Sequence, residues 1–349
     1  MKLLFIGSYS EADATGVHVA AFDEATGAVA LRGGAAGLKN PTFLQVDALR
    51  RKLYAITEAE GPDGAKRGAA AAYDIDAEGG LSPLNVEETV PAPTCHIELD
   101  AERGIALVSS YHGGLLGLSP IERDGRIGPA SDVKRHEGRS ALPVQDRPRV
   151  HSATFDRARR YAVVCDLGLD RIFTYRVDAE AGRLVSVADV AVAPGAGPRH
   201  FAFHPSLPFG YVINELNATI DAFRYDEERG TLTPIQTVPT LPSDYAGPNA
   251  CADIHLSPDG KFLYGSNRGH DSIAVYAVSE RGELSLVEHA STLGEHPRNF
   301  ALSPNGAFLL AANRDTNDVV VFSRDARTGQ LTPTEHRVNV PKPVCLKFL

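Results

Sequence analysis

Asp23-Glu-Ala-Thr-Gly27 is a short polar turn between two apolar segments, and turns of this kind recur along the chain. The glycine tolerates the positive φ angle of a tight connection, and acidic or hydroxyl side chains before it favour the turn. Because the flanking segments alternate with period two, each turn predicts a β-hairpin. The seven copies lie about 50 residues apart and are Asp23–Gly27, Asp76–Gly79, Glu122–Gly125, Asp178–Gly182, Asp226–Gly230, Ser279–Gly282 and Asp325–Gly329.

A second series of apolar segments has the same period and the same count. In two copies the segment leads into a turn, Pro258-Asp-Gly260 or Pro304-Asn-Gly306, and then into a strand ending in Ser266-Asn-Arg268 or Ala312-Asn-Arg314. Two more strands and the acidic turn complete each unit, and four strands per repeat are typical of a β-propeller blade. The seven segments are Thr42–Val46, Cys95–Leu99, His151–Phe155, Arg199–Phe203, Ala252–Leu256, Arg298–Leu302 and Val344–Phe348.

We therefore predict an all-β fold, a seven-bladed β-propeller with four antiparallel strands per blade. The segment Val344–Phe348 has no strands after it, and the turn at Gly27 has no such segment before it. We expect the C-terminal strand to join the N-terminal strands Leu3–Ser8 and Val17–Phe22, which closes the ring and removes an exposed sheet edge. The chain is then a single domain, 1–349, with blades at about 343–349 plus 1–35, 40–90, 93–135, 149–192, 197–240, 250–290 and 296–336.

Length and composition fit one such ring and narrow the expected partners. No segment approaches the ~20 apolar residues of a membrane span, so no membrane partner is expected. The net charge of −9 argues against a nucleic-acid partner. The four cysteines lie in separate units without a CxxC pair, which indicates neither a disulfide framework nor a metal site and favours a cytoplasmic location. A closed ring has no edge that must pair, so a monomer is expected.

The residues that break the repeat gather at one mouth of the predicted channel. The first two strands of a blade form a hairpin, so the start of the first lies beside the end of the second. Arg199 is thereby placed beside Asn214-Glu215, and Asp253 beside Asn267-Arg268. The residues expected at this mouth are His96, His151, Arg199, His200, Glu215, Arg268, Arg298 and Arg314, with Asn214 and Asn267 at the adjoining strand ends.

Such a cluster of arginine and histidine on an acidic protein predicts a binding site for a small anion. Arginine recognises carboxylate or phosphate through paired, charge-assisted hydrogen bonds. A single Glu among several Arg would stay ionised, and a nearby His is expected to titrate near neutral pH. Glu215 and His151 could then transfer protons.

At these residues the chain resembles the seven-bladed lactonase family. That family contains the propeller type of 6-phosphogluconolactonase and the fungal carboxy-cis,cis-muconate cyclase. The resemblance extends over essentially the whole chain. It is carried by Arg147-Pro-Arg-Val-His-Ser152, Gly197-Pro-Arg-His-Phe201, Val212-Ile-Asn-Glu215, Ser266-Asn-Arg-Gly269, Pro297-Arg-Asn-Phe300 and Ala311-Ala-Asn-Arg314.

The resemblance implies a catalytic set of His151, Arg199, Glu215 and Arg268. In relatives the first run commonly reads Pro-His-Val-His, whereas here Arg149 takes the place of the first His. That replacement weakens any role of the missing His in metal binding or proton relay, and the added Arg strengthens anion binding. His96, Arg149, His200, Asn214, Asn267, Arg298 and Arg314 are the expected substrate-binding residues.

Structural roles for the same residues stay open at this point. His151 could bond the backbone of a neighbouring blade, and Arg199 and Glu215 could form a cross-strand ion pair in the empty protein. Arg298 and Arg314 could be bridges between blades. The basic run Lys134–Arg139, with Arg147 and Arg149, could be a solvated loop or a lid over His151.

The resemblance implies hydrolysis of a sugar lactone by acid–base catalysis, with 6-phosphoglucono-δ-lactone as the most specific expectation. His151 and Glu215 would share the roles of base and acid, while Arg199 and Arg268 would hold the oxyanion or the phosphate. Cyclisation of a carboxymuconate uses related groups in the reverse sense and is the alternative activity. A non-catalytic propeller that binds a ligand or protein at its channel is the second alternative. No metal or other cofactor is expected.

Overall fold

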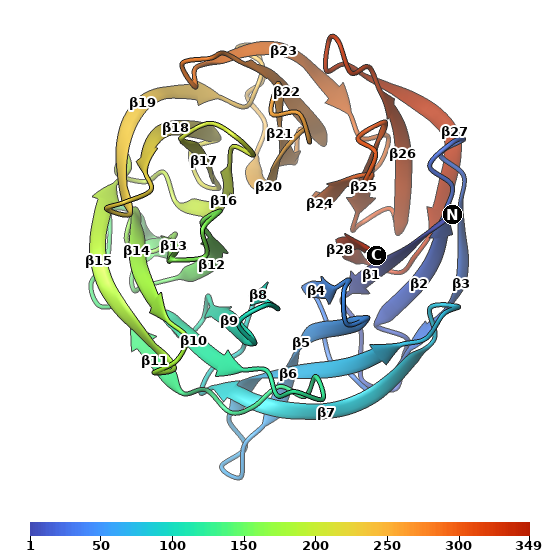
Figure 1. Ribbon diagram of the computed structural model, residues 1–349. Coiled ribbons are helices and arrows are strands. Elements are labelled where there is room, and N and C mark those ends of the chain that lie inside the picture. The colour runs from blue at the N-terminus through green and yellow to red at the C-terminus, as the bar shows by residue number, and fades with distance from the viewer.

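A closed ring of seven antiparallel sheets surrounds a central channel, and the computed structural model describes all 349 residues (Figure 1). Each sheet has four strands and forms one blade. Blade 1 joins both ends of the chain, because the C-terminal strand β28 (Pro343–Phe348) lies innermost and pairs with β1 (Lys2–Ser8), followed by β2 (Val17–Phe22) and β3 (Val29–Ala35). The predicted fold class, including closure of the ring by the C-terminal strand, is confirmed.

The other six blades run in chain order from the channel to the rim. Blade 2 has β4 (Leu44–Asp47), β5 (Lys52–Glu60), β6 (Lys66–Ile75) and β7 (Leu81–Val90), and blade 3 has β8 (His96–Asp100), β9 (Ile105–Ser110), β10 (Leu115–Pro120) and β11 (Asp132–Arg135). Blade 4 has β12 (Val150–Phe155), β13 (Tyr161–Asp166), β14 (Arg171–Asp178) and β15 (Arg183–Ala191), and blade 5 has β16 (Pro198–Phe203), β17 (Phe209–Asn214), β18 (Thr219–Asp226) and β19 (Thr231–Pro239). Blade 6 has β20 (Ala250–Leu256), β21 (Phe262–Arg268), β22 (Ser272–Val278) and β23 (Leu284–Ser291), and blade 7 has β24 (Pro297–Leu302), β25 (Phe308–Asn313), β26 (Asp318–Arg324) and β27 (Leu331–Asn339).

The hydrophobic core lies between neighbouring blades. The second strands β9, β13, β17 and β25 are buried along their whole length, because both faces of each sheet pack against the next sheet. Leu4 and Ile6 of blade 1, for example, pack against Leu310 and Val321 of blade 7. The outermost strand β15 alternates between exposed and half-buried residues, since one side faces water.

The seven turn glycines do more than end hairpins. All of them have positive φ, between 59° at Gly182 and 93° at Gly79. Most also lie against the preceding blade: a Cβ at Gly27 would collide with the ring of Phe308, and one at Gly329 with the ring of Phe262. Next to this contact, the hydroxyl of Tyr264 donates a hydrogen bond of 2.9 Å to the carbonyl of Gly329. The turns therefore dock each blade onto its neighbour.

The segment between blades 3 and 4 is held in place by buried hydrogen bonds. It contains the only helical element, a 3₁₀ turn at Pro143–Gln145, so no helix here is long and apolar enough to cross a lipid bilayer. The buried amide of Gln145 donates to the carbonyl of Leu167 at 2.8 Å and to Asp170 at 2.7 Å. This part of the expected loop is thus pinned to blade 4.

Replacement of Gly329 by Ala should destabilise the ring through both the backbone and the packing. The left-handed backbone is expected to cost about 1–2 kcal/mol and the overlap with Phe262 about 1–3 kcal/mol. Gly37→Ala is the matched control, because Gly37 has φ of 101° with no atom within 4 Å of an added Cβ and so tests the backbone effect alone. Urea unfolding followed by circular dichroism measures both; equal midpoints for the two variants would contradict docking by the turn.

Candidate active site

The predicted mouth is a cavity of about 260 Å³ at the end of the channel where the inner strands begin. His151, Glu215 and Arg298 line it, as do the side chains of Tyr9, Glu58 and Tyr111 from blades 1, 2 and 3. Side chains from six blades thus meet around one opening, which brings two histidines, His151 and His112, together with two carboxylates and a guanidinium.

A β-bulge in the inner strand sets the direction of two of these residues, His151 and Arg298, and also that of Arg199. In blade 5 the register passes from Pro198 to His200 and leaves Arg199 unpaired, and the same step leaves out His151 in blade 4 and Arg298 in blade 7. A bulge bends the strand and re-aims the side chain of the extra residue. Each of these side chains is therefore presented at the start of its strand, where the mouth lies.

Glu215 is held by two guanidinium groups at a single oxygen. Its Oε2 lies 2.9 Å from Arg199 Nε and 3.0 Å from Arg268 Nη2, whereas the structure gives Oε1 no donor. Burial alone would raise the pKa of Glu215, but Arg268, Arg199 and Arg298 together hold that pKa below its usual value. The cross-strand ion pair of Arg199 and Glu215 therefore exists in the empty protein, and Glu215 is ionised with one free oxygen.

Arg199 and Arg268 lie behind Glu215 and do not line the cavity. Both are buried, and both also bind the backbone of blade 6: Arg199 donates to the carbonyl of Ala252, and Arg268 to those of Ala250 and Cys251, at 3.0 and 2.8 Å. Arg199 has one further partner, the ring of His200 at 3.2 Å. Their geometry suits the support of Glu215 better than the direct contact with substrate that we expected.

His151 is a neutral imidazole in this environment. Its side chain is buried, and Nδ1 has no hydrogen-bond partner. Burial, with Arg199, His200 and Arg298 nearby, lowers the pKa of His151 well below its usual value. The expectation that it titrates near neutral pH is therefore wrong, because desolvation and three neighbouring cationic or ionisable groups all disfavour the imidazolium.

Arg298 is a free cation on the cavity wall. No carboxylate lies within ion-pair distance of its guanidinium, which sits over the ring of Tyr9 at 6.0 Å. It is thus not a bridge between blades. Arg314 is not one either, because it pairs with Asp315 at 2.6 Å in its own blade and lines a different, outer cavity.

Asn214 and Asn267 point away from the mouth, Asn214 into its own blade and Asn267 toward the segment that joins blades 5 and 6. Asn214 donates to Asp221 at 2.8 Å, and Asn267 donates to the carbonyl of Thr240 at 2.8 Å. Successive side chains of a strand face opposite sides, so the residue before Glu215 or Arg268 is directed away from it. Arg149 does not line the cavity itself but stacks over the ring of the cavity residue Tyr111 at 4.8 Å and binds Asp146 at 2.9 Å.

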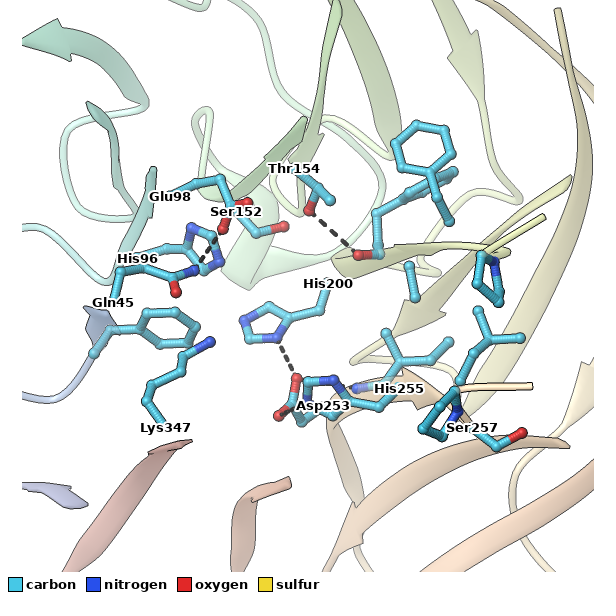
Figure 2. Close-up of a pocket in the computed structure, with 18 residues that line it drawn as sticks. Gln45, His96, Glu98, Ser152, Thr154, His200, Asp253, His255, Ser257 and Lys347 are labelled. Carbon is cyan, nitrogen blue, oxygen red and sulfur yellow. Dashed lines mark hydrogen bonds and ion pairs between the residues drawn. The ribbon is translucent and has the colours of Figure 1, made fainter. Parts of the chain in front are cut away.

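His96 and His200 line a second cavity, of about 320 Å³, toward the opposite end of the channel (Figure 2). Each lies one residue further along its inner strand than the mouth residues, and a strand advances about 3.3 Å per residue, so both lie deeper. The rings of His96 and His151 lie 5.5 and 5.2 Å from that of His200, and these imidazoles separate the two cavities. No group of His, Cys, Asp or Glu side chains here or elsewhere has the arrangement to hold a metal ion.

Three cavity residues were missed although the repeat could reveal them. Tyr9 and Tyr111 directly follow the second strands of blades 1 and 3, as Glu215 does in blade 5. Glu58 lies near the end of the second strand of blade 2, which is longer. Glu58 is fixed by Asn40, which donates to it at 2.6 Å. The prediction relied on second strands that end in Asn followed by a charged residue. Alignment of the ends of all seven second strands would have identified Tyr9, Glu58 and Tyr111.

Comparison with known proteins gives one consistent result. Residues 3–348 match the family described as "Lactonase, 7-bladed beta-propeller". A protein of Bacillus subtilis (strain 168) named 6-phosphogluconolactonase is 36% identical over 347 residues, which cover 99% of this chain and 97% of that protein.

Two solved structures are similar over their full length. A putative 6-phosphogluconolactonase of Bacteroides fragilis has a TM-score of 0.91 and 34% identity, with 100% of this chain and 98% of that one covered. The periplasmic gluconolactonase of Pseudomonas aeruginosa has a TM-score of 0.92 and 32% identity, with 100% and 99% covered. The chain therefore belongs to the seven-bladed β-propeller lactonase family.

Proposed function

We propose that this protein hydrolyses 6-phosphoglucono-δ-lactone to 6-phosphogluconate at the channel mouth. The observation that carries the proposal is a free carboxylate oxygen of Glu215 beside a neutral His151 and an unpaired Arg298, all on one cavity. A neutral base and a free cation are what lactone opening requires. The names of the Bacillus and Bacteroides relatives support the choice of substrate.

His151 is the general base in the proposed mechanism. It takes a proton from a water molecule, the water oxygen attacks the lactone carbonyl, and the same proton then passes to the ring oxygen as the ring opens. Two guanidiniums hold Oε2 of Glu215, so its free Oε1 orients the attacking water. Cys95 also lines the cavity, but burial raises the pKa of its thiol to about 11, so a thiolate nucleophile is absent at neutral pH.

Arg298 stabilises the oxyanion that forms at the lactone carbonyl. The charge of Arg298 lowers the pKa of both His151 and Glu215, which supports a position near the reacting groups. A fixed cation at a developing negative charge is usually the largest electrostatic contribution to such a reaction. Because Arg298 has no carboxylate partner to leave, it needs no rearrangement when the oxyanion forms.

Arg149 and Arg147 receive the phosphate nearer the opening of the mouth. Both pair with Asp146, so this cluster of two guanidiniums and one carboxylate keeps a net positive charge. Arg149 lies over Tyr111, a residue of the cavity wall, while the lactone carbonyl lies further in near Arg298. The two ends of the substrate thus meet two separate cationic groups.

The chemistry uses only side chains and water. The single domain, the monomeric state, the cytoplasmic location and the lack of nucleic-acid or membrane partners stay predictions. One of the similar structures is that of a periplasmic enzyme, so fractionation of cells is needed to establish the location.

The substrate is tested by supplying 6-phosphoglucono-δ-lactone, unphosphorylated gluconolactone and a carboxymuconate separately. We expect the highest kcat/KM with the phosphorylated lactone, after spontaneous opening is subtracted in a pH-stat. Turnover of the carboxymuconate alone would assign the cyclase activity instead. If none of the three compounds reacts faster than the background, the enzymatic proposal is wrong and a non-catalytic propeller that binds a ligand or protein remains.

Arg149→Gln and Arg298→Gln should have different kinetic effects. Loss of a charged contact to phosphate should raise KM for the phosphorylated lactone about 10- to 100-fold and leave the unphosphorylated lactone unaffected. Loss of the oxyanion donor in Arg298→Gln should lower kcat about 100- to 1,000-fold on both lactones. Arg176→Gln, on the exposed side of blade 4, is the charge-matched control. Identical profiles for the two variants would refute the separation of roles.

The pH dependence of kcat/KM should report His151. A base must be deprotonated to act, and burial together with the charge of Arg199 lowers the pKa of His151 well below its usual value, so the rate should stay level through neutral pH and fall only in more acidic solution. Arg298→Gln removes one of the cations that depress this pKa, so its acidic limb should move to higher pH. His151→Gln should lower kcat about 100- to 10,000-fold, while the control His336→Gln, on the outer strand β27, should not.

A further inference from the structure

A buried chain of hydrogen bonds leads from Glu215 toward the second cavity. Arg199, which binds Glu215 through Nε, directs Nη1 at His200 Nε2 over 3.2 Å. The other ring nitrogen of His200, Nδ1, lies 2.7 Å from Oδ1 of Asp253 in blade 6 (Figure 2). Arg199, His200 and Asp253 are all buried. The proposed catalytic carboxylate is therefore connected to a carboxylate that no substrate in the mouth can touch.

The partners of His200 fix its tautomer. A guanidinium can only donate, so Nε2 of His200 must be the acceptor, and Nδ1 must carry the proton and donate to Asp253. Burial, followed by the charge of Arg199, lowers the pKa of His200 to about 4, which keeps the ring neutral. With both nitrogens engaged in this way, His200 has no group left for a ligand, and our expectation that it binds substrate has no support in this geometry.

Asp253 is itself held by four donors. Oδ1 accepts from His200 and from the backbone N–H of Ile254 at 3.0 Å, and Oδ2 accepts from His255 at 2.8 Å and from Asn299. The amide of Asn299 cannot turn, because its oxygen accepts the N–H of Leu346 in β28 at 2.7 Å. The carboxylate thus has one orientation, set by blades 5, 6, 7 and 1 together.

We propose that His200 and Asp253 are positioning residues of the lactone-hydrolysing site, which fix the guanidinium of Arg199 and, through it, the direction of Glu215. This inference rests on the proposed function. Asp253 sets the tautomer of His200, His200 supplies the acceptor for Arg199, and Arg199 binds Oε2 so that Oε1 faces the mouth. An active site needs side chains that hold each reacting group within about 0.5 Å of its productive position, because small displacements reduce the rate strongly.

Two conservative variants of His200 separate positioning from a merely structural role. In His200→Asn the amide nitrogen takes the place of Nδ1, so the bond to Asp253 is kept and the acceptor for Arg199 is lost. In His200→Gln the amide oxygen reaches the place of Nε2, so the acceptor for Arg199 is kept and the bond to Asp253 is lost. The proposal predicts a kcat about 10- to 100-fold lower in His200→Asn, with KM nearly unchanged, and a kcat within about threefold of wild type in His200→Gln.

Thermal unfolding of both variants completes the comparison. A purely structural histidine would make activity follow stability, whereas the acceptor role predicts that His200→Gln is the more active variant even if it melts at a lower temperature. Wild-type kcat in His200→Asn, or a greater loss in His200→Gln, would overturn the proposal.

A spectroscopic measurement tests the same geometry without any substrate. In protein labelled with ¹⁵N-histidine, the His200 signal, assigned by its loss in His200→Gln, should show Nδ1 protonated and Nε2 unprotonated at pH 7. Asp253→Ala should move this signal toward the other tautomer or toward exchange between the two. The opposite tautomer in the wild type would contradict the proposal. Inactivity on every lactone with the expected tautomer would instead contradict the proposed function and leave the geometry standing.

Discussion

The pairing of β28 with β1 is the constraint on which the rest of this structure depends. It makes the two ends of the chain into one blade, so that all seven inner strands converge on one channel without a free sheet edge. The same strand is part of the hydrogen-bonded path to Arg199, because the N–H of Leu346 orients Asn299, which binds Asp253. The strand that closes the ring therefore also helps to orient the residues of the site.

The charges at the mouth explain both the stability and the reactivity of the site. Burial of Glu215 is tolerable because two guanidiniums solvate it, and removal of one partner of such a buried pair typically costs about 3–5 kcal/mol. Arg298 adds a further positive charge without a counter-ion, so the mouth is cationic although the protein carries a net charge of −9. Burial and this excess of positive charge together keep His151 neutral. An entering anion reduces the positive charge, which raises the proton affinity of His151 when substrate is present.

The repeat in the sequence predicted the backbone well, because glycine turns and alternating strands are local features that every blade shares. It also placed His151, Glu215 and Arg298 at one mouth. The prediction from the repeat failed for side chains whose direction depends on strand alternation, on the bulge or on how deep in the channel they lie. Asn214 lies next to Glu215 yet faces its own blade, and His200 lies next to Arg199 yet faces the second cavity. The direction of Asn214 follows from the regular alternation of β17, which the prediction did not apply. That of His200 cannot be read from spacing alone, since the bulge in β16 shifts the alternation.

The bulge also explains how a repeated scaffold can support an unrepeated function. The register shift at the start of the inner strand leaves Val344 unpaired in blade 1 and Ala252 unpaired in blade 6. In blades 4, 5 and 7 the unpaired residues are His151, Arg199 and Arg298, and the shift changes the direction of their side chains. A bulge is a property of the backbone, so its position does not depend on whether the extra residue is apolar or ionic. Chemistry at the mouth can therefore change by substitution at these positions while blade packing, which rests on the strands beyond the bulge, stays the same.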